Sequence, residues 1–273
     1  MRTKVQIDNF DAVTQFINTA SGSNLTIGKG LDSCTSEVQG SEQFELDGRS
    51  VTLVDTPGFD DSALSDVDVL KMIATSLGTR SGGIYYTRHN RHSHIMRSYK
   101  ENVLLAGVIY VHRISDVRMT GTAKRNFTMF RELCGENALK NVLIVTTMWG
   151  KVDKEEGEAR ETELRNKDGF FRDALEKGAK MVRHEHPDDL NSAKEILRLI
   201  IGNNPSPLLI QQELVDEEKL LEKTSAGKEV NRELVEKMEI HEKEIRILQQ
   251  ELQGTTLRPP MISIETNFFL QKP

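Results

Sequence analysis

The sequence predicts an α/β fold, with a doubly wound and mostly parallel sheet, followed by a long helical extension. Three observations support this prediction. Apolar, β-branched runs at 51–54, 103–111 and 141–147 are typical of buried strands, and amphipathic helical patterns separate them. The first run ends in Asp-Thr-Pro-Gly at 55–58, which places an acid and a tight loop where open α/β sheets bind ligands. After residue 207 the chain is almost wholly helix-forming and rich in charge.

The composition of the chain indicates its size class, its redox state and the kinds of ligand that it is not expected to bind. The chain has 273 residues, 37% of them hydrophobic, and a net charge of -6, which favours one sizeable domain with an appendage and gives no general signal for binding nucleic acid. Its two cysteines, Cys34 and Cys134, have no paired spacing and are typical of reduced thiols. No apolar run approaches the roughly 20 residues of a transmembrane segment, and the start lacks a signal-peptide core. We therefore expect a cytoplasmic protein.

The first predicted strand and helix are short. Residues 5–7 form the strand, and residues 14–20 form the helix. A phosphate loop, where one is present, lies between such a strand and helix. Residues 7–14 do not have its pattern, G-x-x-x-x-G-K-S/T, and the Gly-Lys-Gly sequence at 28–30 does not have it either.

A long polar loop at 21–37 precedes a predicted strand at 43–46. Thr35 lies near the end of this loop, where a hydroxyl can bind magnesium as part of a mobile switch. A threonine in such a loop is more often an ordinary surface residue. The Asp-Gly pair at 47–48 then predicts a hairpin into the next strand. An amphipathic helix at 66–77 follows the Asp-Thr-Pro-Gly motif.

Residues 78–99 differ from the rest of the domain, because they are basic and show no periodicity. They include His89, His92 and His94, but no cysteine or acid lies among these histidines. A loop without fixed geometry is a poor metal site, so we do not expect one here. We interpret the segment as a solvated loop or as sequence foreign to the fold.

Strands and helices then alternate up to residue 203. Further strands are predicted at 103–111, 141–147 and 181–184, and further helices at 121–133, 154–165, 170–177 and 192–201. Because strands and helices alternate, most of the strands should be parallel and should end at one common edge.

The C-terminal part begins with a linker at 204–207 and continues as a predicted helix or coiled coil at 208–253, followed by a tail at 254–273. Spacings of four and three residues connect Leu234, Met238, His241, Ile245, Leu248 and Leu252, as in a coiled-coil seam. Gly227 interrupts this pattern, and the regular stretch is shorter than three heptads. Self-association, a protein partner and a single helix folded back on the domain therefore remain alternatives.

The order of elements and five short segments resemble a group of fungal G-domain proteins. These are P-loop GTPases related to the septin-like and immunity-associated GTPases. The matching segments are 16–22, 33–38, 55–61, 106–110 and 145–150, and the resemblance extends from residue 16 to about residue 253. It implies a G domain at 1–203, within which residues 1–15 and 78–99 are atypical. We hypothesise that these two segments reflect an altered exon structure.

The resemblance also implies a ligand, which is GTP or GDP with Mg²⁺. It assigns Thr14, Thr35 and Asp55 to the metal and Gly58 to the last phosphate. It assigns Thr147 and Trp149 to the guanine base, although packing is an equal alternative for Trp149.

The sequence departs from this family at the phosphate loop. Val13 stands where the family has its phosphate-binding lysine, and Asp8 and Asp11 add negative charge nearby. The missing lysine contact alone is worth roughly 1.5–3 kcal/mol, or about ten- to a hundredfold in affinity. Phe59 replaces the glutamine that positions water in Ras-type enzymes, and residues 147–150 lack the Lys and Asp that read guanine.

These departures leave three readings. The first is a GTP-binding protein, and a GTP hydrolase if active, whose site is weak or defective. The second is a pseudo-GTPase scaffold that acts through its C-terminal helix. The third is an unrelated doubly wound α/β protein in which the Asp-Thr-Pro-Gly motif is coincidental.

Overall fold

The computed structural model describes residues 2–8, 10–25, 38–59, 64–77, 99, 104–117 and 119–256. Thr35, residues 78–98 of the atypical segment and the tail after residue 256 lie outside this part of the chain. The chain separates into two compact units, residues 1–230 and residues 231–273, which are described separately.

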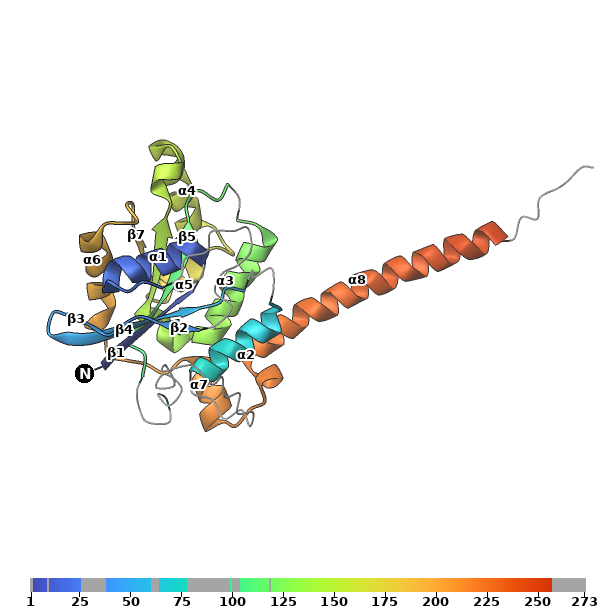
Figure 1. Cartoon of the computed structure of the whole chain (residues 1–273). Coiled ribbons are helices and arrows are strands. Elements are labelled where there is room, and N and C mark those ends of the chain that lie inside the picture. Colours follow the sequence, from blue (N-terminus) through green and yellow to red (C-terminus); the bar gives the residue numbers. More distant parts are fainter. Residues whose placement is uncertain are drawn as a thin grey trace, which may run out of the picture. The chain divides into compact units, whose positions relative to one another are not determined.

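The first unit contains a seven-stranded sheet in the order β2-β4-β1-β5-β6-β7, with β3 also paired to β4 (Figure 1). The strands are β1 (Arg2–Asp8), β2 (Gln39–Gly40), β3 (Phe44–Leu46), β4 (Arg49–Thr56), β5 (Gly107–Arg113), β6 (Val142–Thr147) and β7 (Lys180–Arg183). The pairs β4–β1, β1–β5, β5–β6 and β6–β7 are parallel, whereas β2 and β3 are antiparallel to β4. The predicted doubly wound, mostly parallel sheet is therefore confirmed.

Helices connect these strands. They are α1 (Phe10–Ser21), α2 (Asp66–Ser76), α3 (Gly121–Cys134), α4 (Lys154–Asn166), α5 (Arg172–Glu176), α6 (Leu190–Ile201), α7 (Leu209–Gln211) and α8 (Ser225–Thr256), with 3-10 turns at Glu136–Asn141, Trp149–Lys151 and Leu221–Lys223 and a π-helical turn at Gln212–Asp216. The side chains of Ser65, Thr120 and Asp189 accept bonds from backbone N–H groups of α2, α3 and α6, which explains where these helices begin.

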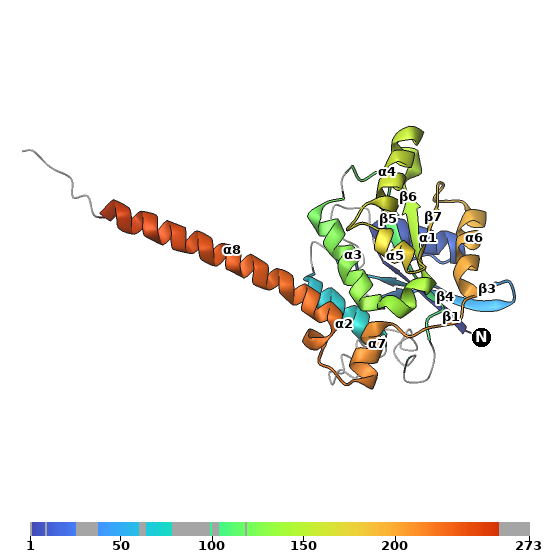
Figure 2. The same ribbon diagram turned by 180° about the vertical axis from the view of Figure 1, so that it is seen from behind.

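Helices cover both faces of the sheet (Figures 1 and 2). Side chains along β5 alternate: Val108 and Tyr110 join the core under α2, α3 and α5, while Ile109 and Val111 join the core under α1 and α6. This period of two buries the strand on both sides, as its continuous apolar sequence predicts.

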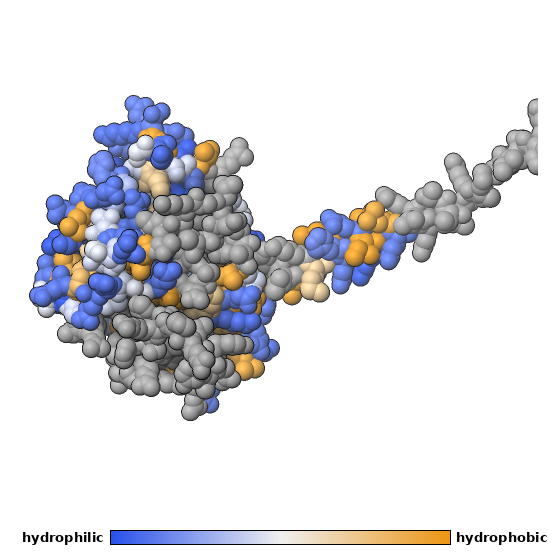
Figure 3. Space-filling view, in the orientation of Figure 1, coloured by the Kyte–Doolittle hydropathy of each residue, from blue (hydrophilic) through white to orange (hydrophobic). Residues whose placement is uncertain are grey.

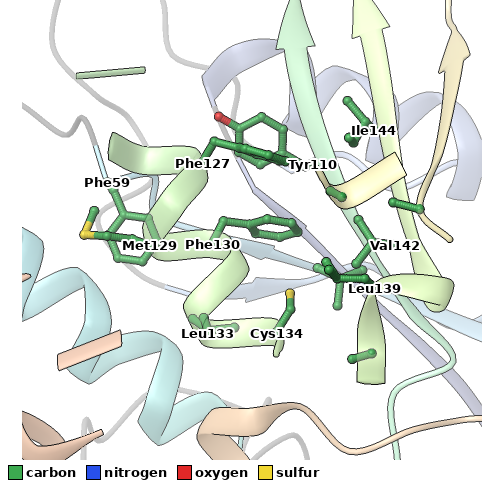
Figure 4. Close-up of a cluster of buried hydrophobic side chains, with 14 of the residues drawn as sticks. Phe59, Tyr110, Phe127, Met129, Phe130, Leu133, Cys134, Leu139, Val142 and Ile144 are labelled. Carbon is green, nitrogen blue, oxygen red and sulfur yellow. The ribbon is translucent and has the colours of Figure 1, made fainter. Parts of the chain in front are cut away.

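Aromatic residues fill the core on the α3 side (Figure 4). The ring of Phe127 lies 5.1 Å from that of Tyr110 and 4.6 Å from that of Phe171, in edge-to-face geometry. Phe59, the residue after the Asp-Thr-Pro-Gly motif, is buried in the same core and lies beside Met129 in Figure 4.

The C-terminal segment differs from the predicted single helix at 208–253. Residues 208–224 form short turns, and the long helix begins only at Ser225. Leu208, Ile210, Ala226 and Val230 are buried in the same core as α2 and α3, so the first unit extends beyond the predicted linker at 204–207 to Val230.

Gly227 explains part of this difference. A Cβ at this position would lie 2.0 Å from the carbonyl oxygen of Leu221, so only glycine permits this approach of the two backbones. The residue that interrupts the coiled-coil pattern thus belongs to the packed base of α8. None of the described helices is both long enough and apolar enough to cross a membrane.

Candidate functional site

Asp55 and Thr14 meet at the carboxyl end of the sheet. Asp55 is the second-last residue of β4, where it lies opposite Ile7 of β1. Thr14 lies on the second turn of α1, and its hydroxyl donates a 2.9 Å hydrogen bond to the carboxylate of Asp55. The two residues are only 3% and 2% exposed. The structure thus brings together two of the three predicted magnesium ligands.

The electrostatics of Asp55 are unusual. Burial raises the pKa of Asp55 to about 7, although hydrogen bonds from Thr14 and from the backbone of Thr56 act in the opposite direction. No described lysine, arginine or histidine forms an ion pair with this carboxylate within 4 Å. The group is therefore close to half protonated at neutral pH, and a metal ion would have to displace its proton.

These oxygen atoms suit a hard cation such as Mg²⁺, which prefers carboxylate and hydroxyl ligands. The junction between β1 and α1 is short. A single residue, Asn9, separates the end of β1 from the start of α1, where a phosphate loop needs several. Val13 is fully buried in the core under α1, so its side chain does not occupy the place of a phosphate-binding lysine at the surface.

The Asp-Thr-Pro-Gly loop continues from Asp55 to a half-buried Gly58. The next residue, Phe59, is 5% exposed and packs into the α3-side core. Its side chain therefore anchors the loop to this core.

The predicted base-binding residues lie at the end of β6. Thr147 is 4% exposed, and its hydroxyl oxygen has no hydrogen-bond partner among the described residues. Met148 follows with φ of 62°, a left-handed conformation that is unusual for methionine. Such conformations cluster at functional sites, and here the turn directs Trp149 back toward the sheet.

Trp149 is held on several sides. Its indole N–H donates to the backbone oxygen and the hydroxyl of Thr146, both at 3.2 Å. The guanidinium of Arg183 lies over the ring at 4.2 Å, and a Cβ on Gly157 of α4 would come within 2.9 Å of the ring. A base could stack on the Arg183 face of Trp149 only by displacing that guanidinium.

Arg183 and Glu161 are part of this region, and the sequence alone did not single them out. Arg183, the last residue of β7, donates to both carboxylate oxygens of Glu161 on α4, with the shortest bond at 2.5 Å. This pairing raises the pKa of Arg183. The only cue in the sequence was the position of Arg183 near the end of the strand predicted at 181–184.

The loop after β7 packs against α1. His184 is 1% exposed, its Nδ1 lies 3.0 Å from the hydroxyl of Ser192, and its Nε2 has no partner among the described residues. Burial lowers the pKa of His184, so the ring is neutral at pH 7. Gln15 and Thr19 of α1 donate to Asp188 and to the carbonyl of Pro187.

A small pocket opens beyond the end of β5. Its volume is about 30 Å³, and it is lined by His112, Ile114, Arg160 and Phe170, among others. Burial lowers the pKa of His112 to about 4, so this ring is also neutral. A pocket of this size holds water but is too small for a nucleotide.

Asp55 and Thr147 are separated by β1 and β5 in the sheet order. Three strand spacings correspond to roughly 14 Å. The two predicted halves of the site therefore share one edge of the sheet but do not touch, and Thr35, the remaining predicted ligand, lies outside the described residues.

Comparisons with known proteins identify the fold. No family model and no curated protein sequence matches the chain. Among solved structures, it is similar to Toc33 from Arabidopsis thaliana in complex with Mg²⁺ and GMPPNP, at a TM-score of 0.52 and 13% identity, covering 75% of this chain and 86% of that chain.

The complex of Toc33 with GDP and Mg²⁺ gives a TM-score of 0.50 at 13% identity and covers 73% of this chain and 82% of that chain. A dimerization-deficient mutant of Toc33 gives 0.51 with the same identity and coverage. The chain therefore has the fold of P-loop GTPase G domains.

Proposed function

We propose that this chain is a G-domain protein that binds guanine nucleotide with Mg²⁺ weakly, because it keeps the metal side of the site and lacks the phosphate loop. The observation that carries the proposal is Asp55, a buried carboxylate with a hydroxyl partner and no described cation. Its place at the carboxyl end of β4, in an Asp-Thr-Pro-Gly loop, is the place where G domains order magnesium. The related Toc33 structures contain Mg²⁺ with GMPPNP or GDP.

In this proposal Asp55 and Thr14 hold the cation, with Thr35 as a third ligand. Gly58 lies at the last phosphate, and Thr147 and Trp149 lie at the base. When bound, Mg²⁺ neutralises charge on the phosphates. The protein's own contribution is to keep Asp55 dry and oriented, which strengthens its interaction with a cation.

The same geometry limits affinity and turnover. Without a lysine and a glycine-rich loop, the phosphates lose a charged contact and several backbone N–H donors. Phe59 is buried and cannot orient water, so we propose that hydrolysis is slow or requires a partner.

The test is a titration with a fluorescent GTP analogue, with and without Mg²⁺, and Toc33 serves as the reference with a related fold. We expect affinity about ten- to a hundredfold weaker than that of a G domain with a complete phosphate loop. The conservative variant Asp55→Asn should lose the Mg²⁺ dependence. Affinity equal to that of the reference would contradict the proposed weakness.

The second candidate is a nucleotide-independent scaffold that interacts through its C-terminal helix. The observation that favours it is the exposed apolar surface of α8 together with the one-residue junction between β1 and α1. If a folded domain showed no Mg²⁺-dependent binding at millimolar nucleotide, this second candidate would be favoured.

A further inference from the structure

Exposed apolar side chains are concentrated on α8. Among the described residues, six of the ten large apolar side chains with high exposure lie within fourteen residues of this helix, at 53–62% exposure. They are Val235, Met238, Ile240, Ile245, Ile247 and Leu248. Figure 3 shows apolar and hydrophilic surface side by side on the described part of α8. Apolar surface gathered in this way marks an interaction site.

The pattern along α8 defines one seam. In heptad terms, Met238, Ile245 and Leu252 occupy a positions, and Leu234, His241 and Leu248 occupy d positions. Ile240 and Ile247 occupy c positions, roughly 130° around the helix from the seam. Two isoleucines of nearly equal exposure, Ile245 at 53% and Ile247 at 55%, therefore lie on different faces.

We propose that α8 pairs with α8 of a second copy of this chain as a parallel, in-register, two-stranded coiled coil. In this arrangement a g residue of one helix lies beside the e residue five positions later in the other helix. Lys237 then lies beside Glu242 of the second copy, and this attraction occurs twice in the dimer. The next such pair, Glu244 with Gln249, involves no repulsion.

The antiparallel alternative uses the same seam but has poorer charge pairing. Placing Met238 opposite Leu248 brings Glu242 beside Glu242 of the second copy and Glu244 beside Glu244. These two repulsions offset the two attractions that Lys237 makes with Glu251. In the parallel arrangement Asn231, an a residue, faces its own copy, and a polar a residue of this kind fixes register.

Charge also favours a protein partner over a lipid surface. Residues 231–253 contain four basic and six acidic side chains, for a net charge of -2. A helix with this charge is repelled by anionic lipid headgroups. The proposal for α8 does not rest on nucleotide binding, so the two can fail separately.

The first experiment is sedimentation velocity on the full chain, comparing Ile245→Glu with its matched control Ile247→Glu. We expect the unmodified chain to form dimers as its concentration rises. Ile245→Glu should weaken the association on the order of a hundredfold, because it buries two carboxylates in the seam, while Ile247→Glu should leave it unchanged. Circular dichroism and thermal unfolding establish that both variants are folded.

The second experiment tests orientation. Lys237→Glu and Glu242→Lys should each weaken the dimer, and the double variant should restore it. In a background with Cys34→Ser, Leu248→Cys should cross-link to itself on mild oxidation, since the remaining Cys134 is buried.

Three outcomes of the dimer experiments would overturn the proposal. The first is that the chain stays monomeric at every concentration. The second is that Ile245→Glu and Ile247→Glu weaken the dimer equally. The third is that Glu251→Lys, and not Glu242→Lys, restores the dimer of the Lys237→Glu variant. A further result would also overturn the proposal. If the chain bound anionic vesicles without dimerising, and Ile245→Glu abolished this binding, the seam would be a lipid-binding surface.

Discussion

Asp55 on β4 and Glu161 on α4 are both buried carboxylates, 2% and 8% exposed, near the carboxyl edge of one sheet. Glu161 receives three hydrogen bonds from Arg183, and Arg165 lies within 3.7 Å of it. Among the described residues, Asp55 receives bonds only from a hydroxyl and a backbone N–H, and burial raises its pKa to about 7. Within the part of the chain that the structure describes, Glu161 thus has a cationic side chain as partner, and Asp55 has none.

A third buried carboxylate supports this contrast. Glu213 is 3% exposed, and it accepts bonds from Lys219 and from the backbone N–H of Ser225 at the start of α8. Glu161 and Glu213 both join elements of the fold, and each is paired with a basic side chain of the same chain. The difference supports the proposal that Asp55 binds a cation, and three substitutions test this.

The largest effect is expected from Asp55→Asn. The raised pKa means that the folded state keeps a proton that the unfolded state has lost, so the free energy of unfolding falls as the pH rises from about 4 to about 7. Asparagine cannot ionise, and at pH 8 the variant should be about 2–4 kcal/mol more stable than the unmodified chain.

Denaturant unfolding at pH 5 and pH 8 measures this difference, which should be smaller at pH 5. Equal stability of the two proteins at both pH values would show that Asp55 already has a permanent cation, and the contrast with Glu161 would disappear.

A smaller effect is expected from Arg183→Met. Methionine keeps apolar contact with Trp149 but removes the three hydrogen bonds to Glu161. We expect a loss of about 1–2 kcal/mol, moderated by the partial exposure of the arginine. The chain has one tryptophan, so its fluorescence reports the unfolding directly.

Arg165→Met is the matched control, because Arg165 lies farther from Glu161 and is 40% exposed. If it destabilised the protein as much as Arg183→Met, the cationic partner of Glu161 would not be Arg183.

The smallest effect is expected from Thr14→Val. At pH 6, where Asp55 is mostly protonated, losing this hydroxyl should cost about 1 kcal/mol. Because the bond from Thr14 lowers the pKa of Asp55, its loss should extend the fall in stability to pH values above 7. Thr14→Ser keeps the hydroxyl and should behave like the unmodified chain; a profile that matches that of Thr14→Val would show that the hydrogen bond from the Thr14 hydroxyl to Asp55 is not the cause of the effect.

The order of elements was predictable from sequence because burial on two faces gives strands a distinctive composition. Val51 to Val54, the β5 run and the β6 run all form central strands of the sheet. The sequence predicted a helix that begins at residue 14, whereas α1 begins four residues earlier, at Phe10. Residues 10–13 contain no capping pattern that would have indicated this start. The site was predictable only in part: Asp55 and Thr14 lie in contact, whereas the roles of Thr147, Trp149 and Gly58 remain predictions.

Sequence by itself determined the doubly wound architecture, the place of Asp55 at the carboxyl edge of the sheet and the absence of a phosphate-loop motif. All three can be recognised from local patterns of residue type. Tertiary structure alone decided that Thr14 bonds to Asp55 across 41 positions, that Arg183 covers Trp149, and that residues 208–230 belong to the domain core. Such contacts join residues far apart in the chain, and burial, charge pairing and pKa depend on what lies nearby in space.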